Sequence, residues 1–403
     1  MDKKIIHKVE EKGISIIIPC YNEAPILQYT IEGLLNIEYE NLEVIFINDG
    51  SKDSTFNVLY KQLELQEVGE NISVDFYDVK TTYKSIKYPF IFVIDKYNSG
   101  KAHSLNVGTA FAKKELVLTM DGDCILEKNA LINMNKTFED EDVIASGGVV
   151  HIMQMFKLEN KVRGIVLMQA LDYIKGFYIY KASLAYNDAL GIISGAFGVF
   201  RKNILMEIGG FKKGLGEDID ITLRFQEYAM NHDKKIVFNR KSICYTECPE
   251  RLNELIRQRV RWQKGFIEAI LYNSSFLLNN IFKSNVCFYL IIDALLSNSF
   301  ASIVLIINTI LIVAKVIYGF PLYMFVYYFT TIAFNIICSI LAIKVAKENT
   351  PNLNTKLLYP MILVDMTVFQ FLRIFFFLKG SVTYYFDNKH WDKVTRTSNC
   401  YKV

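Results

Sequence analysis

The sequence lacks several features that would place it in other classes of protein. Its net charge is only +3, which gives no case for a nucleic-acid partner. Its seven cysteines show no framework spacing, which indicates reduced thiols in a cytosol-facing protein. Cys244 and Cys248 lie close together, but no second pair completes a zinc site, so we interpret them as structural. The first 13 residues lack an apolar core long enough for a signal peptide, and we expect the chain to begin in the cytosol.

Acidic residues are scarce in the last third of the chain, which is rich in Ile, Leu, Phe and Tyr. A chain of 403 residues can carry more than one module, and its 51% hydrophobic content indicates a membrane component. We therefore predict a cytosolic domain over residues 1–270 and a membrane region over residues 271–403.

The first part of the chain alternates apolar strands with helices. Residues Ile14 to Ile18 form a mostly apolar, β-branched run between Gly13 and Pro19, which is typical of a buried parallel strand. A helix is expected from about Ala24 to Leu35, and further strands are expected at residues 42–47 and 90–94. This alternation predicts an α/β fold with a mostly parallel sheet between helices.

The segment Glu115 to Cys124 places two carboxylates at the end of another strand. Residues 116–119 predict the strand, and Asp121 and Asp123 follow it around Gly122. Ligands bind at this edge of open α/β sheets, and two such carboxylates can hold a hard cation, Mg²⁺ or Mn²⁺, which neutralises a diphosphate. Asp-Gly-Asp is also ordinary turn chemistry, so its context has to decide.

Three other polar segments follow expected strands, namely PCYNE (19–23), NDGSKDS (48–54) and NSGKAHSLNVG (98–108). Lys101 follows a glycine at a helix start, where it can meet an anionic group or remain solvated. NDGS is also a common turn. In this order and spacing, the three segments and TMDGD (119–123) resemble the inverting family 2 glycosyltransferases of GT-A fold, from about Ile14 to at least Trp262.

This resemblance implies a UDP-sugar site. It assigns Tyr21, Glu23 and Asp49 to the base and ribose and Lys101 to the vicinity of the nucleotide. Asp121 and Asp123 would then serve the diphosphate and its metal.

The acceptor side is expected in the second half of the domain. Residues 190–200 predict a β-rich run whose glycines let a ligand approach the backbone, and a helix is expected from Asp220 to Met230. The resemblance implies that Ser194 and Gly195 border the acceptor sugar and that Asp218 is the base that takes the acceptor proton. Asp218 could instead only cap the helix, and Glu217, also on the acceptor side, and Asp220 are less favoured acids.

A helix expected to start near Pro249 carries Gln258, Arg261 and Trp262 on one face. This QxxRW pattern resembles membrane synthases of cellulose, hyaluronan, chitin oligomers and poly-N-acetylglucosamine. It implies that Gln258 and Arg261 serve the donor diphosphate and that Trp262 stacks on the acceptor. The alternative is an amphipathic helix at a membrane surface, whose Arg pairs with an acid and whose Trp is an anchor; both can hold.

The last third predicts membrane helices. Residues 286–317 and 320–343 are each longer than the roughly 20 residues needed to cross a bilayer. A third apolar segment, residues 357–378, contains Pro360, Asp365, Gln370 and Arg373, which are costly in lipid. We expect it to pack against other helices, to line a water-filled path or to lie on the membrane surface. The basic tail after Lys379 prefers the cytosol, so two or three crossings stay open.

Together these features predict a multi-pass enzyme of the cell membrane with a cytoplasmic catalytic domain. It would transfer a sugar, first choice N-acetylglucosamine from UDP-N-acetylglucosamine, with inversion to a growing β-linked polysaccharide. The alternatives are a single transfer to a lipid acceptor and a catalytically silent glycan-binding subunit. No apolar segment precedes the catalytic domain, so a secretion channel would need a partner membrane subunit or a homo-oligomer.

Overall fold

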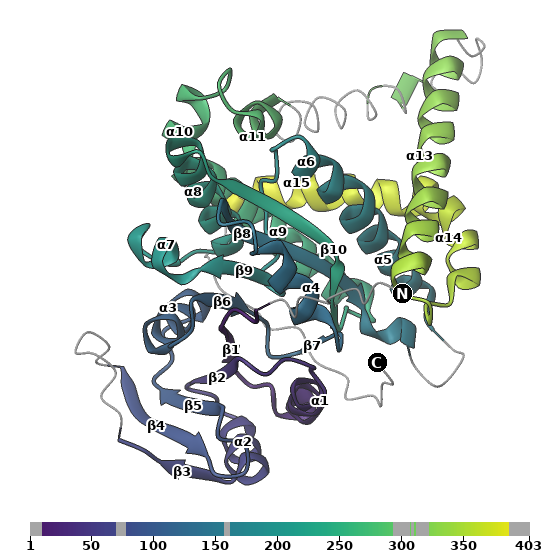
Figure 1. Cartoon of the computed structure of the whole chain (residues 1–403). Coiled ribbons are helices and arrows are strands. Elements are labelled where there is room, and N and C mark those ends of the chain that lie inside the picture. Colours follow the sequence, from purple (N-terminus) through teal and green to yellow (C-terminus); the bar gives the residue numbers. More distant parts are fainter. Residues whose placement is uncertain are drawn as a thin grey trace, which may run out of the picture.

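The computed structural model describes residues 10–69, 78–156, 162–292, 307, 310–311 and 322–386. Its centre is a ten-stranded sheet in the order β3-β4-β5-β2-β1-β6-β9-β8-β10-β7 (Figure 1). Four neighbouring strands run parallel, namely β5 (Ile91–Lys96), β2 (Leu42–Asp49), β1 (Ile14–Cys20) and β6 (Leu116–Thr119). Their carboxyl ends therefore meet at one edge of the sheet.

Helices cover both faces of these strands. Ile16 and Ile18 of β1 pack in one buried cluster with α1 (Ala24–Leu35) and α2 (Thr55–Leu63). Ile17, which points to the opposite face, packs in a second cluster with α3 (Lys101–Phe111). Successive side chains of a strand face opposite sides, so an uninterrupted apolar run is buried on both. The predicted α/β fold is confirmed.

The second half of the sheet reverses direction. Strand β9 (Gly198–Arg201) lies antiparallel between β6 and β8 (Val143–Ile152), and Thr119 pairs with Gly198. The start of β9 therefore lies beside the end of β6. Strand β10 (Lys235–Thr246) runs parallel to β8, and β7 (Cys124–Leu126) pairs antiparallel with β10. The loop before β9 consequently reaches the edge that carries Asp121.

The remaining described elements surround this sheet. Strands β3 (Leu65–Glu67) and β4 (Val79–Ser85) form an antiparallel ribbon at its edge. The other described helices up to residue 288 are α4 (Ala130–Thr137), η1 (Met153–Phe156), α5 (Gly164–Lys175), η2 (Gly176–Lys181), α6 (Ala182–Tyr186), α7 (Lys202–Glu207), α8 (Glu217–His232), α9 (Leu252–Tyr272), α10 (Ser274–Asn279) and α11 (Asn285–Phe288).

The β-rich run expected over residues 190–200 is wrong for most of its length, because only the end of it belongs to β9. The amides of the preceding loop bind side chains of α8 instead of a neighbouring strand. The Ile193 amide donates to Thr222 Oγ1 at 2.9 Å, and the Gly195 amide donates to Asp218 Oδ2 at 3.4 Å. These bonds hold the loop over the amino end of α8.

Two helix starts also differ from expectation. Helix α8 begins at Glu217 with Gly216 as its N-cap, so Asp218 lies in the first helical turn and does not precede it. Helix α9 begins at Leu252, later than the expected start near Pro249. The Pro249 carbonyl accepts a hydrogen bond from Gln169 Nε2 at 2.7 Å, which keeps this segment as a loop.

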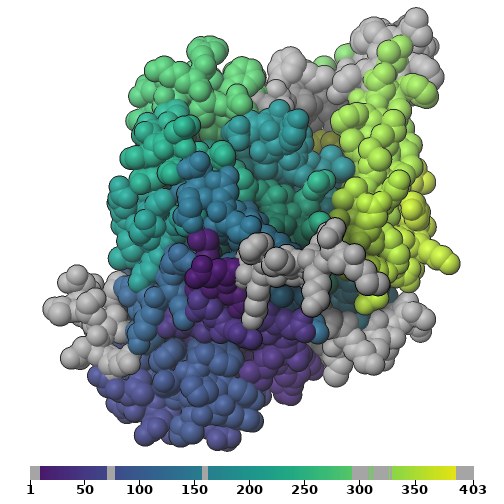
Figure 2. Space-filling model, viewed as in Figure 1, coloured from purple at the N-terminus to yellow at the C-terminus, as the bar shows by residue number. Residues whose placement is uncertain are grey.

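Two described helical segments are long and apolar enough to cross a membrane, Phe329–Asn349 and Thr355–Phe386. Only 22% and 17% of their apolar windows are buried, unlike a core helix of a soluble protein. The first belongs to α13 (Leu322–Asn349), which stands along one side of the molecule (Figures 1 and 2). The span expected at 286–317 and the turn after it lie mostly outside the described residues, as does the basic tail.

The second segment contains η4 (Thr355–Leu357), α14 (Tyr359–Val364), a π-helical turn η5 (Asp365–Phe369) and α15 (Gln370–Phe386). Helix α15 runs across the direction of α13 and packs along α9 (Figure 1). Two helices that cross in this way do not both stand upright in one bilayer. This arrangement favours the surface-lying alternative for the third apolar segment.

Two glycines bring the loop before α8 against α9. A Cβ on Gly265 would lie 2.6 Å from the Leu215 carbonyl oxygen, and one on Gly216 would lie 2.3 Å from the Gly265 carbonyl oxygen. Both obstacles are backbone atoms, which cannot rotate away. The absence of side chains here sets the distance between the helix that carries Asp218 and the helix that carries QxxRW.

We expect Gly265→Ala to lower the free energy of unfolding by about 1–3 kcal/mol, because the added methyl group overpacks this contact. Gly164→Ala is the matched control, since its Cβ at the start of α5 would have no neighbour within 4 Å among the described residues. Thermal unfolding in detergent compares the two. Equal melting temperatures would contradict the close approach.

Candidate functional site

Lys101 joins residues from three elements at the carboxyl edge of the sheet. It is the first residue of α3, and its Nζ lies 2.8 Å from Asp121 Oδ1 and 3.1 Å from Glu217 Oε1. Burial lowers the pKa of Lys101, but attraction to these two carboxylates outweighs it, so the pKa is raised above its ordinary value. The lysine therefore stays charged and holds the β6 turn close to the start of α8.

Asp218 lies beside this ion pair. Its Oδ1 accepts a hydrogen bond from the Ile219 amide at 3.0 Å, and Lys101, Ser194, Gly195, Glu217 and Asp218 line one small cavity. Burial, and then repulsion from Glu217, raise the pKa of Asp218. Asp220, by contrast, is buried in an ion pair with Arg224 at 2.8 Å, which gives it a structural role. Asp218 therefore remains our prediction for the general base.

Asp49, which the resemblance assigned to the base and ribose of the donor, is buried in an ion pair with Lys96. Its Oδ1 accepts from Lys96 Nζ at 2.6 Å and its Oδ2 from the Gly100 amide at 3.0 Å, while Lys96 is fully buried and also pairs with Asp78 at 3.0 Å. Asp49 thereby anchors the loop that leads to Lys101. A buried charge is tolerated only when it is paired and hydrogen-bonded, as here.

The turn between β1 and α1 carries Tyr21 and Glu23 at the same edge. The Glu23 amide donates to Thr55 Oγ1 at 2.8 Å, and the Asn22 amide donates to Ser51 Oγ at 3.0 Å, so this turn is tied to the one after β2. A Cβ on Gly122 would lie 3.0 Å from Glu23 Cγ. Glu23 therefore packs directly against the Asp-Gly-Asp turn.

Asp121, Asp123 and Cys124 form a group whose potential ligand atoms all lie within 4.8 Å of one another. A hydrogen bond with Cys244, and then burial, raise the pKa of the Cys124 thiol well above its ordinary value, so the thiol stays neutral. Mg²⁺ and Mn²⁺ prefer carboxylate oxygens to a neutral thiol. The two carboxylates therefore fit the expected cation, and Cys124 is a packing residue.

Helix α9 carries Gln258, Arg261 and Trp262, but Trp262 is not in the small cavity. Its ring has the Arg259 guanidinium 4.4 Å from its centroid and the Tyr173 ring at 6.4 Å. It remains 39% exposed, which leaves part of its surface for a ligand. Sequence analysis missed Arg259, although its spacing of three residues from Trp262 on one helix could have indicated the contact.

Lys181 is a second residue that sequence analysis missed. It ends the π-helical turn η2, and such turns occur often at functional sites. Burial lowers the pKa of Lys181 to about 8, while attraction to Asp218 opposes the shift. Its positive charge opposes the rise in the pKa of Asp218 but does not cancel it. A single lysine in an apolar helix gives no sequence signal of this role.

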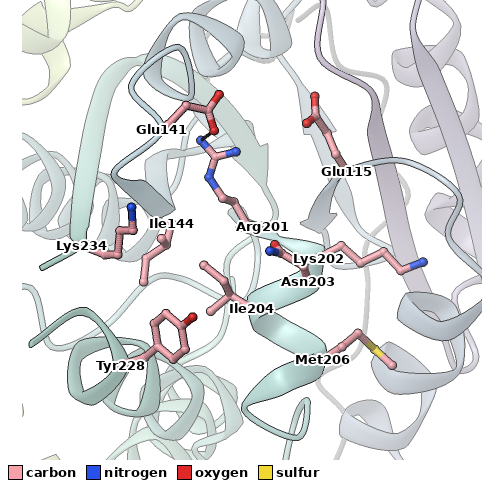
Figure 3. A pocket seen from close by; sticks show the side chains of 10 residues that line it. All are labelled: Glu115, Glu141, Ile144, Arg201, Lys202, Asn203, Ile204, Met206, Tyr228 and Lys234. Carbon is pink, nitrogen blue, oxygen red and sulfur yellow. Dashed lines mark ion pairs between the residues drawn. The ribbon is translucent and has the colours of Figure 1, made fainter. Parts of the chain in front are cut away.

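A larger cavity, of about 600 Å³, lies elsewhere (Figure 3). Glu115, which precedes β6, and Arg201, which ends β9, line it, so it lies at the opposite end of these strands from Asp121. Its cations already have partners: Arg201 pairs with Glu141 at 3.0 Å, and Lys234 pairs with Asp142 at 2.8 Å. This cavity holds none of the predicted site residues.

Known proteins are similar to this chain in sequence and in fold. The chain is 28% identical over 261 residues to a poly-β-1,6-N-acetyl-D-glucosamine synthase of Staphylococcus epidermidis, a match that covers 64% of this chain and 56% of the relative. The synthase of Staphylococcus aureus (strain COL) is 28% identical over 272 residues, 67% of this chain and 59% of that one. The chain thus spans less than two thirds of the length of these relatives.

A solved mannosyltransferase from Pyrobaculum calidifontis, PcManGT in complex with GDP-Man and Mn²⁺, has a TM-score of 0.58 and 16% identity. This match covers 94% of this chain and 89% of that structure and supports the GT-A fold. A family model described as "Glycosyltransferase like family 2" matches residues 12–265, which include every candidate site residue. The chain therefore belongs to glycosyltransferase-like family 2.

Proposed function

We propose that this protein is an inverting membrane glycosyltransferase that moves a sugar from a UDP-sugar to a growing β-linked polysaccharide. One observation carries the proposal: Lys101 bridges Asp121, on the donor side, and Glu217, beside Asp218, in a single cluster. A donor group that binds the Asp-Gly-Asp turn would therefore lie close to a carboxylate of raised pKa. Transfer with inversion needs this pairing of a diphosphate site with a base.

The reaction can be written with these groups. The acceptor hydroxyl oxygen attacks the anomeric carbon while Asp218 takes the hydroxyl proton, and the bond from that carbon to the β-phosphate oxygen breaks to release UDP. Lys101 and Arg261 are the cations we assign to the charge that grows on the leaving diphosphate, where an interaction stabilises the transition state more than the ground state.

Asp121 and Asp123 would hold the divalent cation, which when bound neutralises the diphosphate. Tyr21, Glu23 and Asp49 are assigned to the nucleoside side of the donor, the last through the loop that it anchors. Ser194, Gly195, Glu217 and Trp262 are assigned to the acceptor, and Gln258 to the donor. The cavity that Lys101, Ser194, Gly195, Glu217 and Asp218 share supports the assignments around it.

We propose N-acetylglucosamine as the sugar, because the staphylococcal relatives are named as synthases of its β-1,6-linked polymer. We place the catalytic domain in the cytoplasm, where UDP-sugars are made, and the apolar helices in the cell membrane as a multi-pass region. Export of the polymer would use a partner membrane subunit or a homo-oligomer.

Asp123→Asn should weaken Mn²⁺-dependent binding of UDP far more than it lowers the melting temperature, since two like charges at a turn gain most from a bridging cation. Calorimetric titration of UDP with and without Mn²⁺ measures this. Asp140→Asn, at an exposed and distant position, is the control. If the wild-type protein binds UDP equally well in both buffers, the metal assignment is wrong.

Asp218→Asn should leave UDP binding nearly intact and reduce turnover by roughly two or more orders of magnitude, the scale of a lost general base. A base works when deprotonated, so wild-type turnover should fall as the pH drops through a pKa above the ordinary value of 3.8. The pH profile of turnover tests this. A larger loss in Glu217→Gln would identify the neighbouring carboxylate as the base.

The function itself is tested with purified protein in detergent and a panel of radiolabelled UDP-sugars, with products separated by size. We expect a ladder or a high-molecular-weight product from UDP-N-acetylglucosamine. A single lipid-soluble product would favour one transfer to a lipid. No product from any donor, with intact UDP binding, would favour a silent glycan-binding subunit.

A further inference from the structure

Five charged side chains form one chain of ion pairs outside the proposed catalytic cluster. They come from α5, α9, η5 and α15. The contacts are Lys175 to Asp365 at 2.6 Å, Arg373 to Asp365 at 2.5 Å, Arg373 to Asp172 at 3.2 Å, and Arg259 to Asp172 at 3.1 Å. The chain connects the carboxyl-terminal helical segment to the QxxRW helix through α5.

One member of this ion-pair chain is fully buried. Asp365 is fully buried although it lies within an apolar segment long enough to cross a membrane. It accepts from Lys175 on one oxygen and from Arg373 on the other, and Lys175 also donates to Asn335 of α13 at 2.6 Å. Removal of one partner of a buried ion pair leaves a costly charge, so these contacts strongly restrict the helices that carry them.

The ion-pair chain ends at the exposed tryptophan. Arg259 is held by Asp172 and lies 4.4 Å from the centroid of the Trp262 ring. A guanidinium over an aromatic face is attracted by the ring electrons and fixes the ring plane. Tyr173, which follows Asp172 on α5, contacts the same ring from another direction. The orientation of Trp262 therefore depends on Asp172.

The two arginines of the ion-pair chain, Arg259 and Arg373, carry further hydrogen-bond donors. Nε and Nη2 of Arg259 and Nε of Arg373 are buried and have no hydrogen-bond partner within the described part of the chain. Nη2 of Arg259 contacts Asp172 as an ion pair at 3.1 Å. Buried donors generally find a partner, in protein, water or ligand. Arg259 therefore keeps unused hydrogen-bonding capacity beside the Trp262 ring.

We propose that Asp172, Arg259, Asp365 and Arg373 are positioning residues for the acceptor, and that the carboxyl-terminal segment sets the orientation of Trp262 through them. This inference rests on the proposed function, in which Trp262 is the acceptor plane. Among the described ion pairs, none joins this chain of charges to Lys101 or Asp121, or to Arg261, the donor cation of α9. We therefore expect a break in the ion-pair chain to change acceptor binding and to leave UDP binding as it was.

The test uses the two tryptophans of the sequence, Trp262 and Trp391. In a Trp391→Phe background, Trp262 is the only tryptophan, and acrylamide quenching of its fluorescence in full-length protein reports its environment. We expect Asp172→Asn, and also the more distant Asp365→Asn, to change the quenching constant about twofold or more. In an assay of product formation, the KM of these variants for the acceptor should rise about fivefold over the wild-type value, the scale of one lost cation–π contact. Their affinity for UDP should stay the same.

Arg201→Gln is the matched control, because it also removes a mostly buried guanidinium from an ion pair, but at the distant cavity of Figure 3. It should lower the melting temperature without a change in Trp262 quenching. If Asp365→Asn does not fold, Arg373→Lys replaces it, since it keeps the charge and loses the two-pronged contact.

An unchanged quenching constant in folded Asp172→Asn and in the folded carboxyl-terminal variant would overturn the proposal. The quenching measurement needs no substrate. It therefore still decides the positioning role if the wild-type protein makes no polymer, which is the outcome that would overturn the proposed function.

Discussion

The ion pairs of Lys101 are the interaction on which the candidate site depends. Asp121 follows β6, Glu217 opens α8, and only the lysine at the start of α3 contacts both among the described ion pairs. Without its charge, three acids at one edge of the sheet would repel one another, because Asp218 lies beside Glu217. The same charge is the one that a diphosphate would meet. The ion pairs of Lys101 thus hold the site together without a ligand, and a bound diphosphate would replace a carboxylate as the partner of Lys101.

A second constraint comes from the backbone. The loop before α8 contacts α9 at Gly216 and Gly265, and the loop before β9 bonds its amides to Thr222 and Asp218. These contacts fix the helix that carries Asp218 relative to the loop that we assign to the acceptor. The glycine contact involves no side chain at all, so nothing in the sequence marks it as part of the site.

The apolar carboxyl-terminal helices are also held by contacts between charged side chains. Asp365 and Arg373 would be costly if left unpaired in an apolar segment, yet each pairs with charges of the catalytic half of the chain. Both side chains contact α5, and such contacts are compatible with the surface-lying arrangement that the crossing of α13 and α15 favours. Gly380 of α15 allows a close approach as well, since its Cβ would lie 2.5 Å from Gln263 Cβ on α9. The carboxyl-terminal helix is therefore part of the structure around the QxxRW motif.

The strands and turns of the donor half follow from the amino-acid sequence alone. Apolar β-branched runs bounded by glycine and proline act locally, and parallel strands bring their carboxyl ends to one edge, so the order of segments is enough to group Glu23, Asp49, Lys101 and Asp121. The other features of the site depend on tertiary contacts. These include the antiparallel insertion of β9, the ion pair of Lys101 with Glu217 and the ion pair of Asp365 with Lys175, all of which join residues far apart in the chain. Local propensity and spacing do not specify these contacts, because the contacts depend on which surfaces the folded chain buries together.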